Sequence, residues 1–179
     1  MELRGKTIYL RLAQLTDANF IHSLRVDKRY NKHLSKIDGN VIKQREWLIE
    51  YKKREILGTE YYFIIHRQID SLPIGTVRIY DFLGDKDSFC WGSWILNEDK
   101  TRYAALETAL LIYDFAFFNL GFKRCHMDIR KDNIKVINFH KKFGVKIISE
   151  TELDLIGHYF PKDYLIIKED IIKVINNNS

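Results

Sequence analysis

The chain has 179 residues, of which 46% are hydrophobic and 30% are charged. That length suits a single domain over residues 1–179, and that hydrophobic content excludes an intrinsically disordered protein. The formal charge of +5 arises from basic and acidic residues mixed along the chain. This excess fits a polyanionic small ligand such as a nucleotide, fits nucleic acid less specifically, and also fits a solvated surface without a partner.

The cysteines and the start of the chain bear on the compartment. Cys90 and Cys125 lie in apolar runs where cysteine is usually a small buried hydrophobe, and no Cys/His spacing indicates a metal site. The first residues lack the apolar core of a secretion signal. Glu107 and Asp114 interrupt the most apolar helical run, which argues against a membrane span. We therefore expect a reducing, cytoplasmic setting, with neither metal nor membrane.

The first half of the chain mixes strand and helix patterns. Apolar and polar residues alternate over 7–12, as in a strand, and cap-type residues precede a short helix over 18–24. After a polar segment over 25–40, Asn40 is placed to cap a second helix that runs to about Glu55. Three further strands joined by short loops predict an antiparallel meander over 60–66, 74–82 and 88–96.

The second half begins with a central helix to about residue 119, which Gly121 is placed to end. A strand over 123–129 and a helix capped by Asp132 or Asn133 follow, the helix stopping at Gly144. The remaining elements are expected to be strands over 145–149 and 164–168 and a terminal helix over 169–175. The order predicts a mixed α/β chain with one crossover helix in its centre.

The turn that opens the central helix has the features of an anion site. Lys100 and Arg102 place two positive charges there, and the small Ala104 and Ala105 allow a ligand to approach the backbone. A first helical turn adds unpaired N–H groups and the positive end of the helix dipole, which suits a pyrophosphate. A plain strand–turn–helix with solvated basic residues is an equally weighted alternative.

The element order, with Lys100–Ala105 and the helix after Asn133, resembles the GNAT superfamily of acyl-CoA-dependent N-acyltransferases over nearly the whole chain. The resemblance implies an α/β (α+β) fold with about seven mostly antiparallel strands, four helices and a possible C-terminal helix. In that family, backbone amides of Arg/Gln-x-x-Gly-x-Gly/Ala hold the CoA pyrophosphate. Here Lys100, Thr101, Arg102, Tyr103, Ala104 and Ala105 occupy the motif, so Lys100 replaces Arg or Gln and Tyr103 replaces a glycine.

The second matching stretch resembles the family's Asn-x-x-Ser/Ala-x-x-x-Tyr-x-x-x-Gly-Phe helix. Asn133 matches the Asn that contacts the CoA arm, Gly144 matches the glycine, and His140 falls on the Tyr that protonates the leaving thiolate. Seven residues make nearly two helical turns, so Asn133 and His140 project from one face. Asn138 also belongs to the expected CoA contacts, and Lys141 either reaches the CoA 3′-phosphate or lies on a solvated face.

The remaining site residues follow from the reaction. Asp81 is a candidate general base, with Glu60 as a second, and each is also explained as a surface carboxylate. The resemblance implies that a backbone N–H near Ser93–Ile95 meets the oxyanion; Trp94, Ile95 and Leu96 are expected beside the cofactor. Trp91 and Trp94 differ by an odd number, so a regular strand puts them on opposite faces. Arg25, Asn31, Trp91 and Ser93 are expected to contact the acceptor, with a solvated loop or a core tryptophan as the alternatives.

The amino-acid sequences of several predicted strands are similar to those of a bacterial GNAT branch. Members of that branch acylate nucleotide-linked amino deoxysugars for surface polysaccharides such as lipopolysaccharide. The expected cosubstrate is acetyl-CoA or another acyl-CoA, with no metal and no nucleic acid, in a monomer or homodimer. Two alternatives stay open: an N-terminal acetyltransferase of the ribosomal-protein type, and a non-catalytic acyl-CoA sensor. The sensor is favoured by Tyr103 in the glycine position and by the absence of an obvious general base. A nucleic-acid module is a distant fourth reading.

Overall fold

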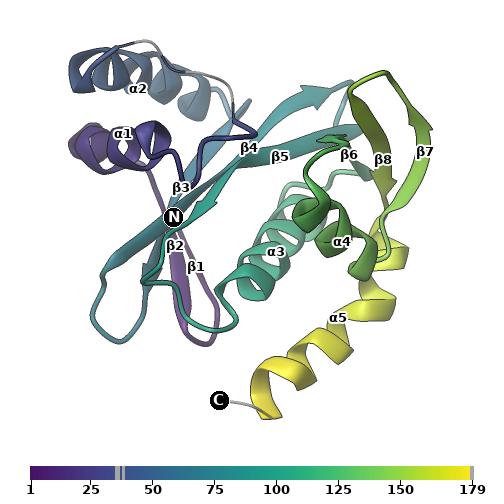
Figure 1. Cartoon of the computed structure of the whole chain (residues 1–179). Coiled ribbons are helices and arrows are strands. Elements are labelled where there is room, and N and C mark those ends of the chain that lie inside the picture. Colours follow the sequence, from purple (N-terminus) through teal and green to yellow (C-terminus); the bar gives the residue numbers. More distant parts are fainter. Residues whose placement is uncertain (35–36, 38, 178–179) are drawn as a thin grey trace. The chain divides into compact units, whose positions relative to one another are not determined.

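The computed structural model describes residues 1–34, 37 and 39–177. Residues 35–36 and 38 of the polar segment 25–40 therefore lie outside the described residues, as do 178–179. Figure 1 shows the chain with its helices and strands labelled.

Eight strands of the described residues follow one another as hydrogen-bonded neighbours. In that order they are β1 (Glu2–Arg4), β2 (Ile8–Leu12), β3 (Tyr61–Arg67), β4 (Pro73–Leu83), β5 (Ser88–Leu96), β6 (Arg124–Arg130), β8 (Asp154–Tyr159) and β7 (Lys146–Glu150). The pairs β1–β2, β2–β3, β3–β4, β6–β8 and β7–β8 are antiparallel, and β5–β6 is parallel. The expected mixed, mostly antiparallel sheet is confirmed, and it has one strand more than the seven expected.

Five α-helices occur in the described residues: α1 (Ala18–Val26), α2 (Val41–Ile56), α3 (Ala104–Asp114), α4 (Ile134–Lys142) and α5 (Pro161–Asn177). Asn40 caps α2 as expected, because its side chain accepts hydrogen bonds from the backbone N–H groups of Ile42 and Lys43. Helix α3 continues into a π turn, Phe115–Asn119. Gly121 then adopts a φ of 81°, which glycine tolerates without strain, and the helix ends there as expected.

The chain divides into two compact units. The first comprises residues 1–80 and 91–111, and the second comprises residues 81–90 and 112–179. The chain passes from one unit to the other within β4, β5 and α3. The expectation of a single domain over residues 1–179 stays a prediction.

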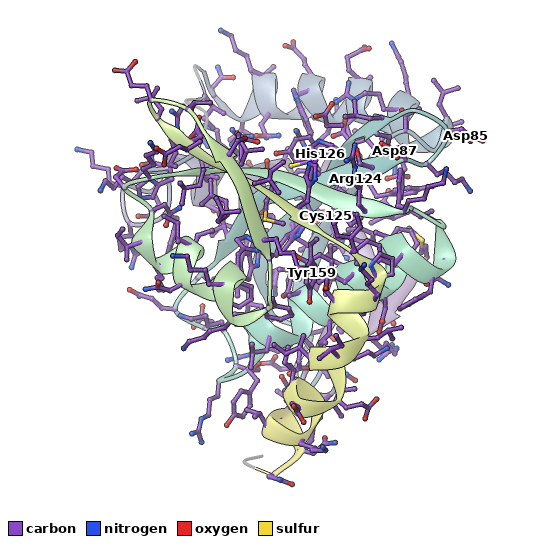
Figure 2. The ribbon with its side chains drawn as sticks, turned by 90° about the vertical axis from the view of Figure 1, so that its right-hand side faces the viewer. Asp85, Asp87, Arg124, Cys125, His126 and Tyr159 are labelled. Carbon is purple, nitrogen blue, oxygen red and sulfur yellow. The ribbon has the colours of Figure 1, made fainter. Side chains whose placement is uncertain are left out.

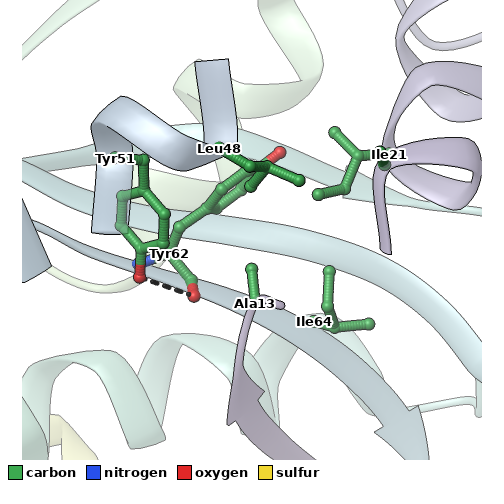
Figure 3. Packing of buried hydrophobic residues seen from close by; sticks show 7 residues of the cluster. Ala13, Ile21, Leu48, Tyr51, Tyr62 and Ile64 are labelled. Carbon is green, nitrogen blue, oxygen red and sulfur yellow. Dashed lines mark hydrogen bonds between the residues drawn. The ribbon is translucent and has the colours of Figure 1, made fainter. Parts of the chain in front are cut away.

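In the first unit, α1 and α2 pack against β3 (Figure 3). Ile21, Leu48 and Ile64 are buried there, and burying an aliphatic side chain of this size contributes about 1.5–3 kcal/mol. Tyr51 adds a polar link, since its hydroxyl accepts a hydrogen bond from the backbone N–H of Tyr62 at 2.8 Å. This core fixes α1 and α2 on the sheet.

In the second unit, an aromatic core surrounds Tyr113 of α3. Its ring lies 4.9 Å from that of Tyr159 and 5.5 Å from that of Tyr164, measured between centroids. The carboxylate of Asp114 accepts hydrogen bonds from the Tyr164 hydroxyl at 2.8 Å and the Lys168 ammonium at 2.7 Å. Helix α5 is thereby tied to the end of α3 by both apolar and charged contacts.

The C-terminal part differs from the expected order. The residues 164–168, expected as a strand, lie inside α5, and the last strand is β8 (Asp154–Tyr159). The β-branched residues of 164–168 favour a strand locally. Pro161 at the first helical position and the burial of Tyr164, Ile171 and Ile175 on one helical face favour the helix that forms. Strand β1 was also not anticipated.

Candidate active site

Strand β5 is distorted where the expected oxyanion site begins. Ser93 has a φ of 45°, in the left-handed region, which interrupts the alternation of side chains along the strand. As a result the rings of Trp91 and Trp94 lie 5.1 Å apart, tilted by 53°. The expectation that these two tryptophans face opposite sides is wrong, because it assumed a regular strand.

Strands β4 and β5 approach closely beside this distortion. A Cβ atom on Gly75 would lie 2.1 Å from the backbone oxygen of Ile95, so only glycine fits there. The Thr76 hydroxyl donates to the backbone oxygen of Ser93 at 3.1 Å. The N–H of Asn97 donates to the backbone oxygen of Ile74 at 2.8 Å. These contacts fix the path of residues 93–97, which lead into the loop before α3.

The loop over residues 97–103 carries the expected anion-site residues. Lys100 and Arg102 are exposed, Thr101, Tyr103 and Ala105 are half-buried, and Ala104 is fully buried at the first position of α3. The Arg102 guanidinium lies 5.1 Å from the centroid of the Tyr103 ring. The N–H groups of the first turn of α3 are directed toward this loop by helix geometry. Tyr103, in place of the family's glycine, is the last residue of this loop, and its backbone oxygen accepts a hydrogen bond from the N–H of Glu107 at 2.9 Å.

Glu107 of α3 anchors this loop, a role that sequence reasoning missed. Only 2% of Glu107 is exposed, and its carboxylate accepts hydrogen bonds from the N–H groups of Lys6 and Thr7 at 2.6 and 2.8 Å. The Thr7 hydroxyl bonds both this carboxylate at 2.5 Å and the Thr101 hydroxyl at 2.7 Å. A carboxylate in the middle of the most apolar helix was the signal available in the sequence.

Two arginines pair with one buried carboxylate in the first unit. Glu60 is buried and paired with Arg54 at 2.6 Å and Arg78 at 3.4 Å, so it is not the surface carboxylate or the free base considered from the sequence. The Arg78 guanidinium lies 4.1 Å from the Tyr80 ring centroid and 5.6 Å from that of Trp47. Sequence reasoning missed Arg54 and Arg78, because their spacing along the chain does not relate them.

Of the two acceptor residues expected in the segment 25–40, Arg25 lies in the last turn of α1 and Asn31 follows that helix. Arg25 is half-buried, and burial lowers its pKa, with the positive charge of Arg78 acting in the same direction. The Arg25 guanidinium therefore lies close enough to Arg78 for the two positive charges to repel each other. Asn31 donates from Nδ2 to the backbone oxygen of Val26 at 3.3 Å, which closes the end of α1.

In the second unit, Asp81 contacts a histidine that sequence reasoning did not single out. The Asp81 carboxylate lies 3.0 Å from Nε2 of His126, and Nδ1 of His126 lies 2.9 Å from the Ser88 hydroxyl. Figure 2 shows His126 beside Arg124 and Asp87, which form an ion pair at 2.9 Å. Residues 81, 88 and 126 lie far apart along the chain, so no local motif revealed the cluster.

Helix α4 carries the remaining expected residues. The Asn133 side chain accepts a hydrogen bond from the N–H of Val136 at 3.4 Å and caps the helix, while Asn138 and Lys141 are exposed. His140 is only 7% exposed, and burial lowers its pKa to about 4. Its imidazole is therefore neutral at pH 7.

Within the first unit the structure thus brings together the distorted strand and the 97–105 loop, and it places Arg25 near Arg78. Within the second unit it joins Asp81 to His126. Among the residues that the structure describes, no group of three or more His, Cys, Asp or Glu side chains is arranged to hold a metal ion. No helix in that part of the chain has the length and apolar character needed to cross a membrane.

Comparison with known proteins identifies the family. A family model described as Acetyltransferase (GNAT) domain matches residues 7–146. A solved structure of apo FdhC, described as a nucleotide-linked sugar GNAT, is similar at 46% sequence identity and a TM-score of 0.89, covering 97% of each chain. The probable N-acetyltransferase YjcK of Bacillus subtilis is 28% identical over 148 residues, which are 79% of this chain and 82% of that protein.

More distant structures share the fold. Spermidine N-acetyltransferase from Vibrio cholerae, solved with CoA and spermine, has a TM-score of 0.74 at 17% identity and covers 90% of this chain and 99% of its own. The family match spans most of the sequence, and it includes the distorted strand β5 and the loop that opens α3. On this evidence the chain belongs to the GNAT family of acetyltransferases and is an acyl-CoA-dependent N-acyltransferase.

Proposed function

We propose that this enzyme transfers an acyl group, acetyl in the simplest case, from CoA to the amine of a nucleotide-linked amino deoxysugar. The observation that carries the proposal is the 46% identity, over 97% of both chains, to a protein described as a nucleotide-linked sugar GNAT. We further propose that the product serves surface polysaccharides such as lipopolysaccharide. Both substrates then belong to the cytoplasm, where we place the enzyme.

The cofactor side of the site is formed by the loop before α3. Backbone N–H groups from Lys100 to Ala105 hold the CoA diphosphate, and the Lys100 and Arg102 side chains add charge. Support comes from the anchoring of this loop by Thr7 and Glu107, which holds Thr101 in place through a hydroxyl pair at 2.7 Å. The backbone of Trp94, Ile95 and Leu96 lies along the pantetheine arm. We assign Asn133, Asn138 and Lys141 of α4 to the rest of the CoA molecule.

The acceptor side is formed by α1, the segment after it and β5. Arg25, Asn31, Trp91 and Ser93 contact the acceptor in this proposal. Support comes from the positive charge in this part of the first unit, where Arg54 and Arg78 pair with the single carboxylate of Glu60 and the charge of Arg78 acts on Arg25. An excess of guanidinium groups beside the Trp47 and Tyr80 rings suits the diphosphate and base of a nucleotide.

The proposed chemistry assigns a role to each remaining group. The sugar amine attacks the thioester carbonyl, and a backbone N–H near Ser93–Ile95 stabilises the oxyanion. Asp81 accepts the proton that the nitrogen loses. Since His140 is neutral at pH 7, it stabilises the leaving thiolate by donating a ring N–H hydrogen bond, and solvent supplies the proton that completes the thiol.

The test is a substrate panel. The purified chain is incubated with acetyl-CoA and, separately, with nucleotide-linked amino deoxysugars, N-terminal peptides of ribosomal proteins, and polyamines, and thiol release is followed. We expect turnover on at least one amino sugar, with kcat/KM at least about 10⁴ M⁻¹s⁻¹, the lower end for natural substrates. Turnover on peptides alone would assign the N-terminal acetyltransferase function instead. Acyl-CoA binding without turnover on any acceptor would indicate a sensor.

A further inference from the structure

Three side chains from three consecutive strands of the sheet form a hydrogen-bonded chain in the second unit. Asp81 lies near the end of β4, Ser88 begins β5, and His126 lies in β6. Nε2 of His126 is 3.0 Å from the Asp81 carboxylate, and Nδ1 is 2.9 Å from the Ser88 hydroxyl. Ser88 is fully buried, the His126 side chain is 18% exposed, and that of Asp81 is 56% exposed. These two hydrogen bonds therefore connect a buried serine to a solvent-accessible carboxylate.

The parallel pairing of β5 with β6 produces this arrangement. Ser88 pairs with Arg124, and His126 follows Arg124 by two residues, so both side chains lie on one face of the sheet. The N–H of Arg124 donates to the backbone oxygen of Asp87 at 3.2 Å, and their side chains form an ion pair at 2.9 Å. The register that places Ser88 beside His126 is thus fixed by backbone and side-chain contacts.

Backbone conformation at Asp81 argues that its placement is not incidental. Asp81 has a φ of 54°, and a non-glycine residue in this left-handed region costs roughly 1–2 kcal/mol. A contact as exposed as that between Asp81 and His126 contributes at most about 1 kcal/mol to stability, even for two full charges. The pair therefore only offsets the strain, and a gain in stability does not explain why the carboxylate is held there.

The hydrogen-bonding capacity of Asp81 and Ser88 selects the tautomer of the His126 imidazole. Ionised Asp81 only accepts hydrogen bonds, so it selects the tautomer with a proton on Nε2. Nδ1 then accepts from the Ser88 hydroxyl, which is able to donate. In this tautomer His126 is satisfied at both nitrogens, and Asp81 is fixed in orientation with part of its carboxylate open to solvent. The charged or titratable groups near His126, apart from Asp81, include Arg124, Asp87 and His158.

We propose that His126, oriented by Ser88, positions the Asp81 carboxylate to accept the proton of the acceptor amine. This inference rests on the proposed function, and it adds two positioning residues, His126 and Ser88, to that site. The amine nitrogen forms its bond to the acyl carbon, the carbon–sulfur bond breaks, and the nitrogen proton moves to Asp81. The thiolate gains a proton from solvent, and Asp81 returns its proton to solvent, so the reaction is balanced without any further reactant.

The first experiment measures the imidazole without reference to activity. In the free protein, long-range ¹H–¹⁵N spectra of the histidine rings report which nitrogen carries the proton. We expect His126 in the Nε2–H tautomer in the wild type, and a mixture of tautomers in Ser88→Ala and in Asp81→Asn. An Nδ1–H tautomer in the wild type would overturn the proposed orientation.

The second experiment measures kinetics with acetyl-CoA and the amino sugar found in the substrate panel. We expect Asp81→Asn to lower kcat about 100-fold, and His126→Ala about 10-fold, with acetyl-CoA affinity unchanged. His126→Asn, which retains a donor for Asp81, is expected to recover part of the loss. The double variant Asp81→Asn/His126→Ala is expected to be no slower than Asp81→Asn alone, because both changes remove one function.

A matched control separates positioning from general damage. Glu150 is an exposed carboxylate of the same unit, paired with Lys131 at 3.3 Å, and Glu150→Gln is expected to leave kcat unchanged. Losses that add in the double variant, or a His126→Ala variant with wild-type kcat, would overturn the positioning role while the proposed function stands. A wild-type protein that acylates no amino sugar would instead overturn the proposed function and this role with it.

Discussion

At the scale of single residues, burial of His140 links protonation to stability. Its pKa is lowered to about 4 by burial, against an ordinary value near 6.5, so the unfolded chain binds the extra proton more readily. The neutral ring therefore contributes stability that is fully present above about pH 6.5. That contribution is lost as the pH falls from about 6.5 to about 4.

We predict that wild-type unfolding free energy falls by up to about 3 kcal/mol over this window because of His140 alone. His140→Leu removes the titrating group and keeps the site apolar, so its stability should depend less steeply on pH. Urea unfolding between pH 4 and 7 measures the slopes, with Lys142→Ala, an exposed residue of the same helix, as control. Equal slopes for wild type and His140→Leu would contradict the prediction.

Glu107 provides a second prediction at this scale. Its buried carboxylate accepts hydrogen bonds from two backbone N–H groups and from the Thr7 hydroxyl. A glutamine amide would replace one of the accepting oxygens by an NH₂ group, which cannot accept these hydrogen bonds. Glu107→Gln should therefore lower the unfolding free energy by about 1–3 kcal/mol. It should also weaken acetyl-CoA binding, because Thr101 loses its support through Thr7.

Urea unfolding and calorimetric titration with acetyl-CoA measure the two effects of Glu107→Gln separately. Tyr51 offers a comparison, because it hydrogen-bonds to the backbone of Tyr62 away from the 97–103 loop. Tyr51→Phe should lower stability yet leave acetyl-CoA affinity unchanged. If both variants weakened binding equally, the specific anchoring of the loop by Glu107 would be excluded.

At the scale of elements, the loop before α3 is expected to act as an anion site. Lys100→Ala/Arg102→Ala should weaken acetyl-CoA binding about 10-fold at low salt and less at high salt, because screening already reduces the lost attraction. Binding of S-acetylpantetheine, which lacks the diphosphate, should be unchanged. Titration calorimetry at two ionic strengths measures this, with Lys123→Ala as an exposed control. A loss of the same size for S-acetylpantetheine would count against diphosphate recognition by this loop.

Helix α5 depends on contacts to the end of α3. Tyr164 is fully buried and its hydroxyl donates to Asp114 at 2.8 Å, so Tyr164→Phe should cost about 1–2 kcal/mol of unfolding free energy. Hydrogen exchange should speed up in α5 more than in α2. Leu165→Ala, an exposed neighbour, should change neither quantity noticeably. Uniform acceleration across the chain would show that α5 is not a separate unit of opening.

At the scale of the whole molecule, periodic patterns predicted most elements correctly. Alternation identified β2, and Asn40 identified the start of α2, because these signals act between residues close along the chain. The pattern failed over residues 164–168, where β-branched residues favour a strand. Burial against Tyr113 and the bonds to Asp114 outweigh that local preference and hold the segment as a helix.

The candidate site divides in the same way. The loop over residues 97–105 and the helix after Asn133 were predicted from local spacing and from the family resemblance. Asp81 was predicted only as one carboxylate of two, because its partner His126 is 45 residues away along the chain. Trp91 and Trp94 were placed wrongly, since nothing in their spacing reports the left-handed φ of Ser93 between them.

The sequence by itself thus determined the family, the kinds of most elements and the position of the anion loop, because each depends on residues that are neighbours along the chain. Only the tertiary structure decided that Asp81, Ser88 and His126 meet, that Glu107 anchors the loop, and that the two tryptophans lie together. These facts depend on strand register and on hydrogen bonds between distant residues. Composition and spacing carry no information about either until the strands are paired.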